Sequence, residues 1–179
     1  MALLAVIALP IWRIELDAAQ YPEGLELLIY SHKLEGDVDI INGLNHYIGM
    51  KVLHAEDFIE FTVLPYLVAG YGLVFMLAGI VGRRRLLYVL FGAFVLFGVV
   101  AMIDFWRWLY EYGHDLDPTA PIKVPGMAYQ PPLIGFKQLL NFGAFSIPAI
   151  GGWIFIASGV ALAYCVFAEW RMTKRKQFR

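Results

Sequence analysis

Hydrophobic positions along the chain gather into three long segments that are separated by polar ones. The long segments cover residues 61–81, 86–103 and 147–168, and each comes close to the ~20 residues that a helix needs to cross a bilayer core. Residues 1–12 are also apolar, although as a helix they would reach only ~18 Å. We predict four membrane-spanning helices, the first of them short, in an all-α transmembrane bundle.

The polar segment that follows, residues 13–60, begins with a pattern typical of a strand. Apolar and charged side chains alternate over residues 12–17, and residues 21–24 (Tyr-Pro-Glu-Gly) predict a turn. We therefore expect a small β-hairpin on the membrane surface. Farther along, Asn42 is a residue type that caps helices, and we predict a helix that starts near Leu44 and continues into the first long span.

The second polar segment, residues 104–146, starts with an aromatic run that continues the preceding helix out of the membrane. Asp104 and Arg107 stand three residues apart on that helix and are expected to pair. Five prolines then follow between positions 118 and 132 and make the chain extended and stiff. We expect this stretch to pack as a lid across the ends of the helices, as long structured loops often carry function.

Charge is distributed very unevenly between the two sides of this arrangement. Residues 13–60 and 104–146 hold fourteen acidic and six basic residues, whereas the rest of the chain has a net charge of +7. The basic residues gather in the turn 82–85 and in the tail 171–179, and Lys and Arg beside a span mark its cytoplasmic side. We predict a multi-pass protein of the bacterial inner membrane with a cytoplasmic C-terminus and a periplasmic functional face. Nucleic acid is an improbable partner, because the basic residues lie against lipid.

Composition supports one membrane domain over residues 1–179, since 60% of the chain is hydrophobic and 16% is charged. The single cysteine, Cys165, permits no intrachain disulfide and is expected to be a small packing residue. No histidine lies within a predicted span, which argues against a haem held by two histidines from the bundle. The sequence also has no phosphate-binding loop motif, and we predict no catalytic residue.

The residues with the most distinctive chemistry are His46, Met50, His54 and Asp57. On one continuous helix they would lie within about 80° of one another and would form a single stripe. Imidazole, thioether and carboxylate groups on one face are typical metal ligands, and a thioether beside an imidazole favours copper, especially Cu(I). The stripe therefore predicts a copper site on the periplasmic face.

One straight helix cannot complete such a site. His46 and His54 would stand ~12 Å apart along the axis, so only neighbouring members of the stripe can share an ion. Further ligands are expected from His114 or Met127 in the second polar segment. The alternative is that Met50 packs against a neighbouring helix and the histidines make polar contacts near the lipid headgroups.

Several phrases of the sequence resemble a known family. They are residues 12–16, the Tyr-Pro-Glu-Gly of residues 21–24, Asn-Gly-Leu-Asn-His-Tyr-Ile-Gly-Met-Lys at 42–51, and the run from Lys123 to Phe142. The chain resembles the NosB-type family of small bacterial membrane proteins, which is associated with the gene neighbourhoods of nitrous oxide reductase and its copper-maturation proteins. The resemblance implies an envelope copper enzyme and denitrification as the context, and it implies no catalytic residue.

Two hypotheses for the function follow. In the first, an accessory membrane protein binds copper through His46, Met50, His54 and Asp57, with His114 or Met127, and assists or docks with a periplasmic copper enzyme. In the second, the chain is a metal-free anchor or assembly subunit of an envelope redox complex. There the lid and its aromatic neighbours Trp106 and Trp108 would bind a protein partner.

Overall fold

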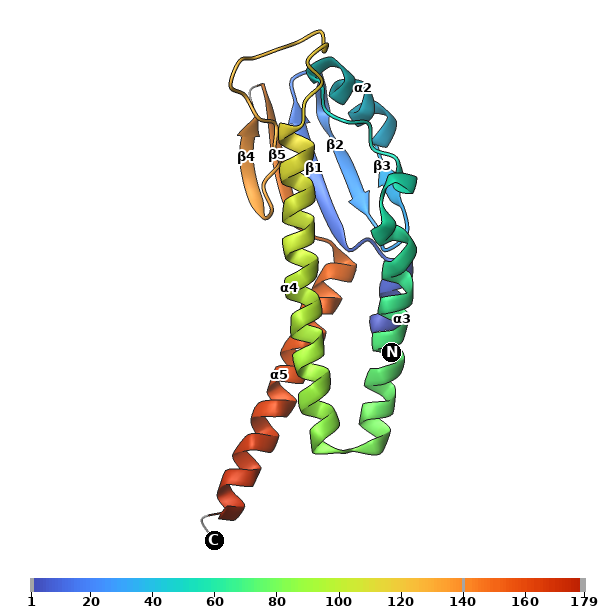
Figure 1. The fold of residues 1–179 in the computed structure, drawn as a ribbon, viewed down its shortest axis with the longest axis vertical. Helices are drawn as coiled ribbons and strands as arrows, with labels where there is room; N and C mark the ends of the chain where they lie inside the picture. Colours follow the sequence, from blue (N-terminus) through green and yellow to red (C-terminus); the bar gives the residue numbers. More distant parts are fainter. Residues whose placement is uncertain (1, 140, 178–179) are drawn as a thin grey trace.

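The structure is a computed structural model that describes residues 2–139 and 141–177. Three long helices extend from a domain built on a β-sheet (Figure 1). The long helices are α3 (Ile59–Val81), α4 (Arg84–His114) and α5 (Ile150–Gln177). Each is long and apolar enough to cross a membrane, which fits a membrane protein.

The prediction of a fourth span at the N-terminus is wrong. Residues 2–8 form only a short helix, α1 (Ala2–Ala5), and one 3₁₀ turn, η1 (Val6–Ala8). Pro10 then has no N–H to donate, and the alternating pattern that begins at Trp12 directs the chain into a strand. Leu4 of α1 instead packs against Gly72, within the span α3.

The prediction of an all-α fold is also wrong, because five strands form one sheet. The strands are β1 (Trp12–Ala18), β2 (Tyr21–Ile29), β3 (Leu34–Gly36), β4 (Gly135–Leu139) and β5 (Phe142–Pro148). Their order is β3-β2-β1-β5-β4, and every neighbouring pair is antiparallel. The expected hairpin is present as β1 and β2, although residues 19–20 make its turn and residues 21–24 lie within β2.

The helix predicted to run from Leu44 into the first span does not form. Helix α2 (Val38–Ile48) begins earlier and ends at Gly49, whose φ of +79° is the left-handed conformation that commonly terminates a helix. The chain then extends to a short turn, η2 (Ala55–Asp57), before α3. Asn42 holds this extended stretch: its side chain accepts from Leu53 N at 2.7 Å and donates to Leu53 O at 3.1 Å.

The sheet, α2 and the sheet-facing end of α4 enclose the main hydrophobic core. We call the part of the chain around this core, residues 9–58 and 104–148, the sheet domain. Aromatic side chains of α4 line the core, and Phe105 contacts the Trp12 ring edge-on at 5.2 Å between centroids. Trp12 Nε1 also donates to Ser146 Oγ at 2.7 Å, a buried hydrogen bond between β1 and β5. A smaller core joins α1 to the long helices and contains the buried residues Leu3, Leu90, Phe94 and Leu162.

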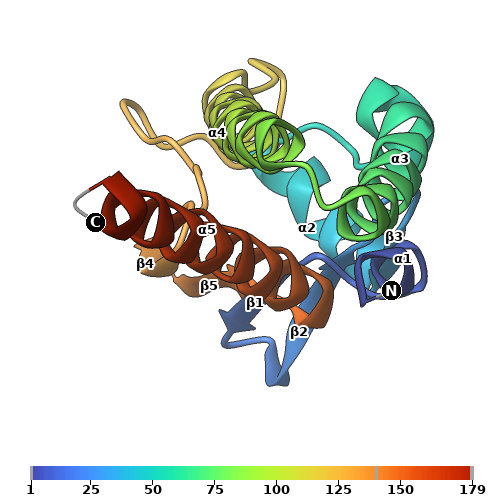
Figure 2. The ribbon, with the colours of Figure 1, turned by 90° about the horizontal axis from the view of Figure 1, so that it is seen from below.

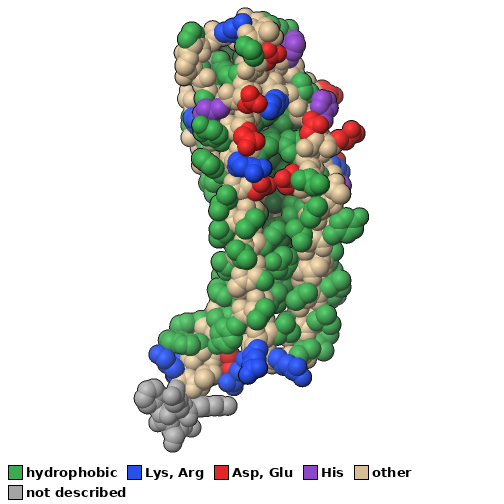
Figure 3. Space-filling view, viewed as in Figure 1, with side chains coloured by type: hydrophobic (Ala, Val, Ile, Leu, Met, Phe, Trp, Pro, Cys, Tyr) green, Lys and Arg blue, Asp and Glu red, His purple; other side chains and the backbone are tan. Residues whose placement is uncertain are grey.

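The long helices bury little of their own surface. Only 11%, 11% and 17% of the most apolar stretches of α3, α4 and α5 are buried inside the protein, and Figure 2 shows the three helices from the end away from the sheet domain. Hydrophobic side chains cover their length, and Lys and Arg gather at that end (Figure 3). Cys165 belongs to the exposed surface of α5, contrary to the expectation of a packing residue.

Candidate functional site

The predicted stripe of metal ligands is not formed on one helix face. His46 lies in the last turn of α2, whereas Met50 and His54 follow the helix in the extended stretch. Asp57 lies in η2. Gly49 is the physical reason, because it reverses the backbone between His46 and Met50 and removes the periodicity on which the stripe depended.

Both methionines named as ligands pack in the core of the sheet domain. Met50 is only 7% exposed and belongs to the main hydrophobic core. Met127 is partly buried against the same core. A thioether in this position contributes to packing, and Met50 can bind an ion only if the core around it opens.

The three histidines named as ligands are exposed. His54 Nδ1 lies 3.5 Å from Asp57 Oδ2. His114 stacks on Tyr110, with 4.0 Å between ring centroids, and its Nδ1 donates to Tyr110 O at 2.8 Å. Within residues 2–139 and 141–177, no three His, Cys, Asp or Glu side chains are grouped so that they can hold a metal ion.

The proline-rich stretch packs over a helix end, but this helix is α2 and not one of the predicted spans. We use the name lid for residues 115–134, which join α4 to β4 and pass over the end of α2 (Figure 1). Asp117 N donates to Gly49 O at 2.8 Å, and Ile122 N donates to Tyr47 O at 2.9 Å. The lid therefore covers the otherwise free carbonyls at the C-terminal end of α2.

Two carboxylates fix the first residues of the lid. Asp117 Oδ1 accepts from the hydroxyl and the backbone N–H of Thr119, at 2.6 and 2.7 Å. These bonds favour the charged form, with the hydroxyl as the larger cause, and lower the pKa of Asp117. Asp115 forms an ion pair with Lys51 at 2.6 Å, and this hydrogen bond raises the pKa of the Lys51 ammonium group.

Exposed apolar side chains form a surface where α2 meets the lid. Tyr47 is 56% exposed and Ile122 is 49% exposed, and the hydrogen bond between their backbones places them side by side. Ile40, also exposed, stands seven residues before Tyr47 and so on the same side of α2. We call Ile40, Tyr47 and Ile122 the α2–lid face. Charged and polar residues border it in the sequence: Asp39, His46 and Lys123.

The two tryptophans proposed for partner binding differ in position. Trp108 stacks with Phe105 and Tyr112 and packs against the core of the sheet domain. Trp106 is 48% exposed on the outside of α4, next to Tyr110. Trp106 is therefore the more accessible of the two for a surface contact.

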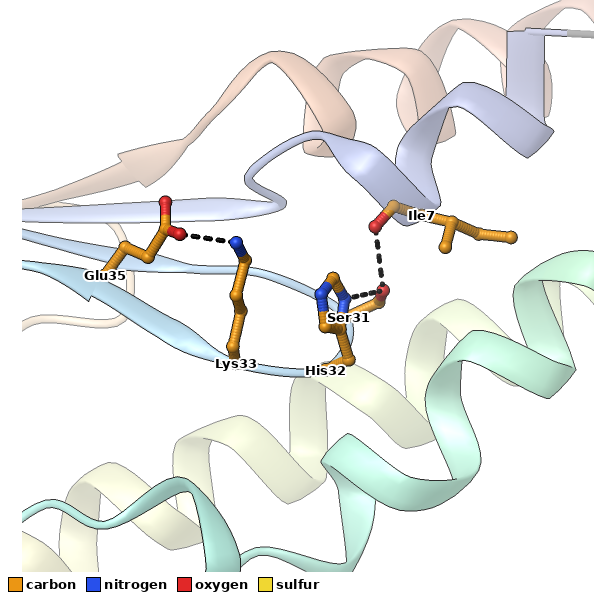
Figure 4. A network of polar contacts seen from close by, with 5 residues as sticks. All are labelled: Ile7, Ser31, His32, Lys33 and Glu35. Carbon is orange, nitrogen blue, oxygen red and sulfur yellow. Dashed lines mark hydrogen bonds and ion pairs between the residues drawn. The ribbon is translucent and has the colours of Figure 1, made fainter.

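A second polar cluster, which sequence reasoning did not single out, lies at the turn between β2 and β3 (Figure 4). The fully buried Ser31 hydroxyl lies 3.5 Å from Ile7 O and 3.4 Å from His32 Nδ1. Lys33 forms an ion pair with Glu35, and this hydrogen bond is the largest cause that lowers the pKa of Glu35. Through the contact between Ser31 and Ile7, the cluster connects the β2–β3 turn to η1, which gives the polar residues of this turn a structural role.

No protein-family model, no curated protein and no solved structure matches the chain. The resemblance to the NosB-type family therefore stays a prediction.

Proposed function

We propose that the chain is a membrane-anchored docking subunit that binds a protein partner in the envelope through the α2–lid face. The exposed apolar surface at Tyr47 and Ile122 carries this proposal. Contiguous apolar surface on a domain outside the lipid marks a site of interaction. It is built by two segments far apart in sequence that hydrogen bonds hold together, so it is presented as a fixed surface.

The orientation of the molecule favours a partner in the periplasm. Lys and Arg occupy the turn between α3 and α4 and the end of α5, which is the distribution of a cytoplasmic side. The sheet domain then lies on the opposite side, in the periplasm of a bacterial inner membrane. There it would serve as the anchor or assembly subunit of an envelope redox complex.

Charge indicates what kind of surface the partner presents. The sheet domain has a net charge of −7, so a basic surface would be attracted over a long range. We therefore expect association to be faster at low salt and slower when salt screens the acidic residues.

Photo-crosslinking in intact cells tests the docking face. A photoreactive phenylalanine analogue at Tyr47 should crosslink to one periplasmic or membrane protein. Ile122→Lys should reduce that product at least about 30-fold, as expected for a ~2 kcal/mol contact at the centre of an interface.

Phe136→Lys is the matched control, because Phe136 is exposed on β4, at the other edge of the sheet from α2 and β3. It should leave the crosslink unchanged. A crosslink that survives Ile122→Lys, or the lack of any product from position 47, would contradict the proposal.

Copper delivery is the second candidate, and the geometry of His114 favours it. Because Nδ1 donates to the Tyr110 carbonyl, the neutral ring has its lone pair on Nε2 and is oriented as metal-bound histidines commonly are. The side chain is exposed, so Nε2 is accessible to a Cu(I) ion in solution. In this candidate Met50 acts only in packing.

Cu(I) binding by the purified protein in detergent distinguishes the candidates. Copper delivery predicts binding that His114→Ala abolishes and His32→Ala preserves. Equal copper retention in both variants, or none in the wild type, would remove copper from the proposal while leaving the docking face untouched.

A further inference from the structure

A shallow, mostly open groove of about 590 Å³ lies along the outside of α4. Helix α4 contributes side chains at intervals of about one turn, and the end of the lid contributes Leu133. The α4 residues are Val95, Gly98, Val99, Met102, Ile103 and Trp106. No side chain with a formal charge lines the groove, and at Gly98 an added Cβ would meet nothing within 4 Å.

The groove lies at the level of the lipid tails next to the sheet domain. Its α4 residues belong to a helix apolar enough to cross a membrane. The first charged residues on this side of α4, Asp104 and Arg107, flank Trp106 and form an ion pair at 3.8 Å, and we infer that the helix leaves the hydrocarbon here. Trp106 stands at this boundary, where the amphipathic indole ring is most favourably placed in membrane proteins.

The lining distinguishes a lipid chain from a helix of another protein. Apolar side chains give no driving force for helix association within lipid, because the tails are equally apolar. Association there relies on small residues repeated every fourth position or on polar side chains. In this groove Gly98 has Phe94 and Met102 at those positions, and the lining residues are otherwise large and apolar. The groove therefore favours a flexible hydrocarbon chain.

We propose that this groove is a binding site for one acyl chain of a membrane phospholipid. The chain lies along α4 from Trp106 towards Val95, with its headgroup beside Trp106. Because Leu133 belongs to the lid and its carbonyl accepts from Ser146 Oγ at 3.1 Å, the bound chain also touches a segment attached to the sheet. The lipid thereby joins the sheet domain to the membrane helices.

Photolabelling of the full chain in nanodiscs tests this site. The discs contain phosphatidylcholine with a small fraction that carries a diazirine within one acyl chain, and labelled residues are mapped by mass spectrometry. We expect labels concentrated on residues 95–106 and 133, relative to the equally exposed face of α3 at Leu73 and Leu77. Gly98→Phe fills the groove and should lower this labelling about tenfold.

Gly92→Phe is the matched control. Gly92 lies on the same helix, has nothing within 4 Å of an added Cβ and does not line the groove. It should label as the wild type does, with the same melting temperature as Gly98→Phe. Even labelling around all three helices would overturn the proposal, as would protection of residues 95–106 by a crosslinked second protein or a second copy of this chain.

Discussion

Tyr112 and Tyr129 are both buried in the core of the sheet domain, but their hydroxyl groups differ. Asn45 Nδ2 donates to Tyr112 Oη at 2.5 Å, and both residues are buried. Tyr129 Oη has no hydrogen-bond partner among the described residues, although the side chain is only 1% exposed. A buried hydroxyl stabilises the fold only when it is paired.

The same substitution should therefore have opposite consequences at the two positions. Tyr112→Phe leaves the buried Asn45 amide without its acceptor and should cost ~1–3 kcal/mol. Tyr129→Phe removes an unpaired polar group and should leave stability unchanged or slightly raised. Thermal unfolding of the purified variants in one detergent measures both. If Tyr129→Phe lowered the stability as much as Tyr112→Phe, the Tyr129 hydroxyl would have a hydrogen-bond partner after all.

Acid should loosen the lid through Asp117. Its lowered pKa means that the folded protein binds the proton more weakly than the unfolded chain does. The resulting stability is present above the ordinary carboxyl pKa of about 4, and it is lost as pH falls through the lower value of the folded state. Asp117→Asn cannot lose a charge. Its melting temperature should fall less steeply than that of the wild type between pH 5 and pH 2, and parallel curves would refute this role.

The chemistry of single residues could be predicted from the sequence only in part. The pairing of Asp104 with Arg107 was predicted from their spacing and is confirmed, with Glu111 as a second partner of Arg107 at 3.6 Å. The grouping of His46 with Met50 required a continuous helix, and a glycine between them ended it. Burial of Met50 depends on contacts distant in sequence, so the local pattern could not show it.

At the scale of elements, Gly49 controls how α2 ends and how the lid packs on it. A Cβ at this position would lie 2.9 Å from Ala120 Cβ and from Asp117 O, and its φ is positive. Gly49→Ala should therefore destabilise the protein by more than the ~1 kcal/mol typical of glycine changes, and it should open the lid to protease. Limited proteolysis followed by mass spectrometry locates the cuts, which are expected between residues 115 and 134.

Gly43→Ala provides the comparison within the same helix. Gly43 lies in the interior of α2, is exposed and has nothing within 4 Å of an added Cβ. Alanine should raise stability there by roughly 0.5–1 kcal/mol and leave the lid resistant to protease. A similar loss of stability in Gly43→Ala and Gly49→Ala would mean that helix propensity, rather than the contact with the lid, determines the stability of this region.

The apolar elements were predictable and the sheet was not. Length and hydropathy identify α3, α4 and α5 without knowledge of their neighbours. Strand β1 follows from its alternating pattern, whereas β4 is mostly exposed and the sequence of β5, Phe-Gly-Ala-Phe-Ser-Ile-Pro, has no charged residue to alternate with apolar ones. These two strands form because β5 pairs with β1, more than 120 residues away, and no local signal reports such a partner.

For the whole molecule, the opposite charges at its two ends predict its orientation in the membrane. In a Cys165→Ala background, Gln20→Cys in the hairpin turn should react with a membrane-impermeant maleimide in intact cells. Met172→Cys, exposed near the end of α5, should react only after lysis. The positive-inside distribution is the reason. The reverse labelling pattern would place the sheet domain in the cytoplasm and exclude a periplasmic partner.

The pairing of β1 with β5 also has a consequence for biosynthesis. Strand β1 is made near the start of the chain, but its second neighbour is made only after α3 and α4, just ahead of α5. Until then one edge of the β1–β2 hairpin has unpaired backbone groups, which attract other extended chains. The sheet is therefore completed late in synthesis, and truncation before residue 142 should yield an aggregation-prone protein even though two membrane helices are complete.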